Sequence, residues 1–175
     1  MPPDVIAQFL AKYESLAGGA HRASSPEEAA GIVVSVLKTT DATAVALGDL
    51  PDDLMLAVEK ACEAGGVAVL KPPYDSAGLP DSIEACGLGI SWAAFAVADA
   101  GAMVELTTDD AIRLVSTLPR THVGFVPAAE VRASLEEAAG PIRDFYNAHP
   151  EDAAATFISG PSRTGDIEMR LTLGV

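Results

Sequence analysis

Positive charge and aromatic side chains are both scarce in this sequence. Its 175 residues include 11 Lys and Arg against 25 Asp and Glu, which gives a formal net charge of −14, and 5% of the residues are aromatic. A surface of this sign repels the phosphates of nucleic acids and the headgroups of anionic lipids. We therefore expect no nucleic-acid partner, and we expect an anionic ligand to need a local positive pocket.

Cysteine and long apolar runs are also lacking. Cys62 and Cys86 show no CxxC spacing, and two thiols are too few to hold an iron–sulfur cluster. The start, Met1-Pro2-Pro3-Asp4, has no signal-peptide pattern, and the longest apolar run, 90–98, is too short to span a bilayer. These features predict a cytoplasmic protein with reduced thiols and no membrane insertion.

Motifs for metals and nucleotides are missing as well. His21, His122 and His149 are scattered without HxH or HExxH spacing, so we expect no metal site. Gly87-Leu88-Gly89 lacks the third glycine of a dinucleotide fingerprint, and no GxxxxGK[ST] motif occurs. We therefore predict that the chain binds no cofactor directly.

The remaining pattern alternates helices and strands. Ser25, Pro26 and Glu28 mark one clear helix start, and the alternation predicts an α/β fold with a largely parallel sheet flanked by helices. Apolar periodicity leaves 89–99 open between a helix and a strand, and it predicts helical stretches over 130–139 and 142–146. We expect one domain over 1–175, with the helix in 1–20 at its periphery.

A ten-residue segment near the C-terminus has the strongest functional pattern. It follows an apolar strand, and we predict a helical turn that begins near Ser162 or Thr164. A helix N-terminus and the guanidinium of Arg163 suit a carboxylate or phosphate, whereas the alternative is a capped helix with an exposed arginine. Asp166 is expected to pair with Arg163. The candidate ligand-binding residues are Ser159, Gly160, Pro161, Ser162, Arg163, Thr164, Asp166 and Glu168.

Three further residues are secondary candidates. Thr107 and Thr108 lie where a strand gives way to a helix. Either they face the same crevice as the ten-residue segment or, as we favour, Thr108 or Asp109 caps the helix. His122 begins a strand. It is either a general base or, as we favour, a hydrogen-bonded structural histidine.

Three stretches together resemble a known family. The segment 159–168 with Leu171-Thr172-Leu173-Gly174-Val175 closely resembles the C-terminal signature of the LutC/YkgG group of LUD-domain proteins. Gly89-Ile90-Ser91 with 96–101 is similar to the central segment of that family. The run 114–119, with His122-Val123 after it, resembles the segment that follows.

The resemblance implies a NagB/RpiA/CoA-transferase-like fold and a role in bacterial lactate utilisation. In that system a three-component complex oxidises L-lactate to pyruvate, and the other two components carry the iron–sulfur motifs. The resemblance therefore implies a cluster-free subunit with iron–sulfur partner subunits, and we expect it to bind a small carboxylate or a partner surface. Its site would be the candidate residues of 159–168.

Two other functions remain open. The same fold permits a stand-alone enzyme that handles acyl-CoA or sugar phosphates, with Glu105 or Glu168 as the nucleophile. A non-catalytic scaffold is the other.

The chain departs from the family pattern in two places. It has Gly101-Ala102 where the family usually has Gly-Thr or Gly-Ser, and it stops at Val175 where the family continues into one more strand. Either the product is truncated or the signature ends differently here, and a truncation would leave a sheet edge open, which favours pairing with another subunit or a second copy.

Overall fold

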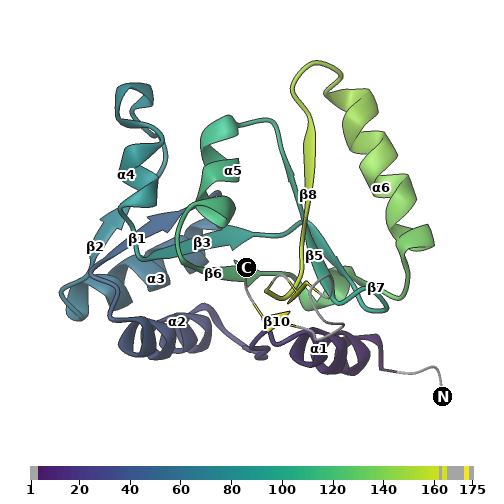
Figure 1. Cartoon of the computed structure of the whole chain (residues 1–175), viewed down its shortest axis with the longest axis horizontal. Coiled ribbons are helices and arrows are strands. Elements are labelled where there is room, and N and C mark those ends of the chain that lie inside the picture. Colours follow the sequence, from purple (N-terminus) through teal and green to yellow (C-terminus); the bar gives the residue numbers. More distant parts are fainter. Residues whose placement is uncertain (1–3, 162, 165–171, 174–175) are drawn as a thin grey trace.

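The computed structural model describes residues 4–161, 163–164 and 172–173, which form two adjoining four-stranded sheets with helices on their faces and a separate two-stranded sheet (Figure 1). The first sheet is wholly parallel, with strand order β2-β1-β3-β6. This sheet confirms the predicted α/β fold with a largely parallel sheet. Its strands are β1 Ala44–Leu47, β2 Ala68–Leu70, β3 Leu88–Trp92 and β6 Thr121–Phe125.

Helices cover both faces of the first sheet. On one face, buried residues of the two longer helices pack with Val45 and Leu47, and on the other Ile83 and Val115 pack with Ala46. The alternation along β1 follows from the two-residue period of a strand. The helices of the first face are α2 Pro26–Thr40 and α3 Asp52–Ala64, and those of the second are α4 Asp81–Glu84 and α5 Asp110–Thr117 (Figure 1).

The second sheet has the order β7-β4-β5-β8 and is mixed. Its β4–β5 and β5–β8 pairs are antiparallel, and its β4–β7 pair is parallel. Its strands are β4 Phe95–Val97, β5 Ala102–Thr107, β7 Val131–Arg132 and β8 Ala154–Ile158. Phe9 of α1 (Val5–Ser15) packs on one face, and Ala138 of α6 (Leu135–Ala148) packs on the other.

The chain passes directly from the first sheet into the second between β3 and β4. Ala93 N–H donates to the Phe125 carbonyl of β6 at 2.7 Å, and Ala94 N–H donates to the Val104 carbonyl of β5 at 2.8 Å. The segment 89–99, open between helix and strand from its sequence, is therefore two strands in two sheets. Its continuous apolar character reflects burial on both faces.

The helix starts agree with local signals in one place and differ in another. The Ser25 hydroxyl accepts from Glu28 N–H at 3.2 Å at the start of α2, as predicted. The two helical stretches predicted over 130–139 and 142–146 are instead the single helix α6, which contains Pro141. The helix begins at Leu135 and not at 130, because Val131 and Arg132 form strand β7 and pair with β4. None of the helices in the described part of the chain is long and apolar enough to cross a membrane.

A close contact between β3 and α5 depends on Gly89. A Cβ atom built on this glycine would lie 1.9 Å from the Val115 carbonyl oxygen of α5. Only a residue without a side chain lets the helix backbone approach the strand this closely. The contact sets the position of α5 over the strands that carry the site described below.

We predict that Gly89→Ala destabilises the protein by about 1–3 kcal/mol or more, because the added methyl group meets backbone that cannot move without disturbing α5. Urea unfolding measures this change. Gly31→Ala on α2 is the matched control, since nothing lies within 4 Å of its Cβ position. This control is expected to stabilise the helix by roughly 0.5–1 kcal/mol, and equal stability of the two variants would contradict the close contact.

Candidate functional site

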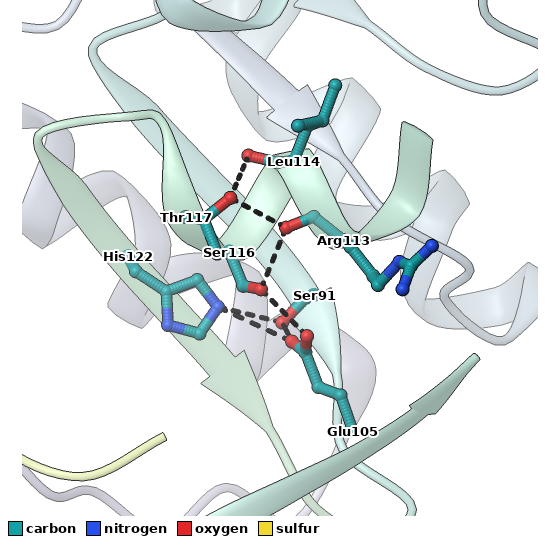
Figure 2. A network of polar contacts seen from close by, with 7 residues as sticks. All are labelled: Ser91, Glu105, Arg113, Leu114, Ser116, Thr117 and His122. Atoms are coloured by element: carbon teal, nitrogen blue, oxygen red, sulfur yellow. Dashed lines mark hydrogen bonds and ion pairs between the residues drawn. The ribbon is translucent and has the colours of Figure 1, made fainter. Parts of the chain in front are cut away.

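A buried carboxyl group lies where the two sheets meet. Glu105 on β5 is 3% exposed, and it is one of few polar residues among the buried side chains. Ser91 on β3 donates to its Oε1, and Ser116 on α5 donates to its Oε2 at 2.8 Å. Figure 2 shows both hydroxyls directed at the carboxyl group. A β-strand of each sheet and a helix therefore contribute to one hydrogen-bonded cluster.

His122 on β6 extends this cluster. Its Nε2 lies 2.7 Å from the Ser91 hydroxyl and 3.8 Å from Glu105 Oε1, and its side chain is 13% exposed. Ser91 therefore stands between the carboxyl group and the imidazole (Figure 2). The prediction that His122 is a hydrogen-bonded histidine is confirmed.

Two glycines make room for the cluster. In the register of β3 and β6, Gly89 is opposite His122, and Ser91 is opposite Gly124. Residues opposite one another in register share a face of the sheet. Each polar side chain thus has a neighbour without a side chain, and the imidazole can lie across the strand toward Ser91.

Burial sets the protonation of both titratable groups. It raises the pKa of the Glu105 carboxyl above its ordinary value, although the hydrogen bonds from Ser91 and Ser116 act in the opposite sense. It lowers the pKa of His122 to about 4. Both shifts favour the uncharged form of the group. Because the pKa of His122 is about 4, its imidazole is uncharged at neutral pH, and the 3.8 Å approach of the two groups is a contact within a hydrogen-bonded network and not an ion pair.

A cavity of about 570 Å³ adjoins the cluster. His122 lines it, together with the β6 residues on either side, and aromatic walls come from Phe9, Tyr13 and Trp92. The first turn of α2 and the loop before it close another side. An apolar cavity with a few polar groups is typical of a small-molecule site. His122 is the member of the polar cluster that reaches this cavity.

Half of the predicted ten-residue segment lies outside the described residues. Ser162, Asp166 and Glu168 are not described, and of Arg163 and Thr164 only the backbone is. That backbone is strand β9 (Arg163–Thr164), which pairs antiparallel with β10 (Thr172–Leu173). The predicted helix start at Thr164 is therefore wrong, because pairing of Arg163 and Thr164 with β10 overrides the local turn signal.

The beginning of that segment does contact described structure. A Cβ atom on Gly160 would lie 2.0 Å from the Leu16 carbonyl oxygen at the end of α1, so this close approach requires a glycine at position 160. Ser159 and Pro161 flank it. Whether these three residues bind a ligand stays a prediction.

Thr107 lies at the opposite end of β5 from the start of the ten-residue segment, and whether Thr107 and Thr108 share a crevice with that segment stays a prediction. Thr107 is paired with Ala154 at the start of β8, whereas Ser159 follows Ile158, which is paired with Met103. At roughly 3.3 Å per residue, the two ends of β5 are about 13 Å apart. Asp109 caps α5 by accepting from Ala111 N–H at 2.7 Å, which confirms the capping alternative.

Sequence reasoning missed Ser91 and Ser116 as parts of the site. Ser91 is the one hydroxyl within the apolar strand β3, and Glu105 is the one charge within the apolar strand β5. A single polar residue at a buried strand position is a usable signal, since burial without a partner is costly. Ser91 is 14 residues from Glu105 and 31 residues from His122 in the sequence, however, and only the fold brings them together.

The comparisons with known proteins identify the family. A family model described as LUD domain matches residues 6–175. The chain belongs to the LUD-domain family. The structural neighbour is a DUF162 family protein from Deinococcus radiodurans, with a TM-score of 0.65 and 17% identity over 90% of this chain and 87% of the neighbour. At this identity the likeness shows the fold.

LUD-domain relatives named "Lactate utilization protein C" match part of the chain. The relative from Anoxybacillus flavithermus is 33% identical over 105 residues, which cover 58% of this chain and 46% of the relative. The relative from Shouchella clausii is 32% identical over 58% of this chain and 44% of the relative, and that from Bacillus subtilis is 32% identical over 53% and 39%. The matches thus span less than half the length of these curated relatives.

We predict that Ser91→Ala destabilises this LUD domain by about 1–3 kcal/mol, because Glu105 Oε1 and His122 Nε2 lose their buried partner together. Urea unfolding at neutral pH measures the change. Ser35→Ala is the control, since its exposed hydroxyl donates only to the Gly31 carbonyl of its own helix. Its effect is expected within about 0.5 kcal/mol, and a Ser91 variant as stable as this control would contradict the network.

The lowered pKa of His122 predicts a dependence of stability on pH. Below its ordinary value of 6.5, the unfolded chain binds a proton on His122 that the folded chain binds only near pH 4. As pH falls from 6.5 to about 4, protonation of His122 in the unfolded chain therefore lowers the free energy of unfolding by about 3 kcal/mol. Above pH 6.5 this contribution to stability is fully present. Glu105 acts in the opposite sense, because its raised pKa lowers stability as pH rises above its ordinary value of 4.5.

Unfolding of His122→Gln across this range isolates the histidine. In His122→Gln, the free energy of unfolding is expected to lose the part of its fall at low pH that His122 causes. His149→Gln, at an exposed position, is expected to keep that part. Parallel pH curves for the wild-type chain and His122→Gln would contradict the burial of a neutral imidazole.

Proposed function

We propose that this chain is the cluster-free subunit of a bacterial complex that oxidises L-lactate to pyruvate. The observation that carries the proposal is that the LUD-domain relatives matching over half of this chain are named lactate utilization protein C. With two cysteines the chain lacks the thiols for a cluster of its own, so the iron–sulfur clusters belong to partner subunits. The subunit works in the cytoplasm as one domain and binds no cofactor directly.

The cavity beside His122 is the proposed site for the small carboxylate. Its walls are largely apolar, and His122 is among the residues that line it. The carboxylate needs a positive partner in a chain with a net charge of −14. Arg163 is proposed for this role, and the surrounding residues of 159–168 are proposed to complete the contact.

An acyl-transfer enzyme is less well supported by the geometry. Its proposed nucleophile Glu105 is 3% exposed, and both of its carboxyl oxygens accept hydrogen bonds from serine hydroxyls. Glu105 is not among the residues that line the cavity. A nucleophilic carboxylate must reach its substrate, and this one is covered by β3 and α5.

Deletion of the gene for this chain in its source organism tests the proposal. We predict a growth defect on L-lactate as carbon source and normal growth on pyruvate, because pyruvate enters after the oxidation step. Re-expression of the wild-type chain is expected to restore growth, and Arg163→Ala at equal protein level is expected to restore less. Equal growth of the deletion strain and its parent on L-lactate would sink the proposal.

A further inference from the structure

The two ring nitrogens of His122 have different surroundings. Nε2 is 2.7 Å from the Ser91 hydroxyl, and Figure 2 shows the other nitrogen, Nδ1, directed away from Ser91 and Glu105. His122 is also among the residues that line the cavity. One side of the imidazole therefore belongs to the buried network, while the residue itself borders the space for a ligand.

The network between Glu105 and His122 can be satisfied in two arrangements of its protons. In the first, a neutral Glu105 donates from Oε1 to Ser91, Ser91 donates to Nε2, and His122 carries its proton on Nδ1. In the second, Nε2–H donates to Ser91, and Ser91 donates to a charged Glu105. Ser116 donates to Oε2 in both. A hydroxyl is both donor and acceptor, so Ser91 fits either arrangement without moving.

We propose that His122 exchanges a proton with a hydroxy or oxo compound in the cavity, and that Ser91 passes the matching proton between His122 and Glu105. His122 is the catalytic residue in this scheme, and Ser91 and Glu105 are positioning residues behind it. If the proposed function holds, the 2-hydroxy acid of that reaction is such a compound. The relay itself rests on the geometry of these residues and not on the identity of the ligand.

The exchange is balanced in protons and involves no electrons. When Nδ1–H gives its proton to a ligand oxygen, Ser91 gives its proton to Nε2 and takes the proton of Glu105 Oε1. Glu105 ends as a carboxylate, the ligand gains one proton, and His122 stays neutral with its proton on Nε2. The reverse sequence takes a proton from a ligand hydroxyl and stores it on Glu105.

The burial of the cluster suits a store of this kind. The raised pKa of Glu105 keeps a proton available on it above its ordinary range, and the lowered pKa of His122 keeps the imidazole uncharged at neutral pH. Uncharged imidazole has one donor and one acceptor nitrogen, which the exchange requires.

Other titratable groups near His122 are few among the described residues. Tyr13 of α1, His21 of the loop before α2, and Asp53 of α3 line the same cavity. On α5, Arg113 is ion-paired with Asp110. None of these groups contributes to the pKa shift of His122, whose cause is burial.

Nitrogen-15 NMR of the His122 ring in the ligand-free protein tests the coupling. Across the pH range in which the protein stays folded, we expect the proton to move from Nδ1 to Nε2 as pH rises through the raised pKa of Glu105 and this carboxyl loses its proton. In Glu105→Gln the amide N–H donates to Ser91 at every pH, so His122 is expected to keep its proton on Nδ1 throughout. In Ser91→Ala the tautomer is expected to lose its dependence on pH.

Ser116→Ala is the matched control. It removes a hydrogen bond to Glu105 that lowers the pKa of the carboxyl, but it leaves the path through Ser91 intact. The tautomer change is expected to persist with its midpoint at higher pH. A wild-type tautomer that stays constant over the range, or a Glu105→Gln variant that still switches, would overturn the proposal. No lactate is present in this experiment, so its outcome is independent of the growth test.

Discussion

The joining of the two sheets depends on the burial of one carboxyl group. Glu105 belongs to the mixed sheet, and its main partner Ser91 belongs to the parallel sheet. A buried carboxyl is costly unless it is uncharged or fully hydrogen-bonded, and the seam between the sheets provides two hydroxyl donors. The close approach of α5 at Gly89 brings one of these donors, because Ser116 follows the residue that contacts this glycine.

Local signals predicted the parts of the fold that are locally determined. The start of α2 is set by Ser25 and Glu28, and the start of α5 by Asp109, and each involves residues within four positions of one another. The parallel sheet followed from the alternation of helices and strands. The early part of the predicted 130–139 helix and the predicted turn at Thr164 failed for one physical reason. In both places pairing with another strand, β4 in one and β10 in the other, overrides the local helix signal.

The site was predictable only in part, because its members come from four elements. His122 stood out as a histidine at the start of an apolar strand, and Glu105 was considered as a nucleophile. Ser91 and Ser116 carry no motif of their own, and their role depends on distances that the fold sets. Both serines lie in segments that resemble the LUD family, Ser91 in 89–91 and Ser116 in 114–119, but the resemblance did not indicate that both contact Glu105.

The passage of the chain from β3 into β4 has a mechanical consequence. Two adjacent amide groups, those of Ala93 and Ala94, are bonded to strands of different sheets. No loop lies between these two amide groups, so a displacement of one sheet relative to the other would act directly on the backbone at Ala93 and Ala94.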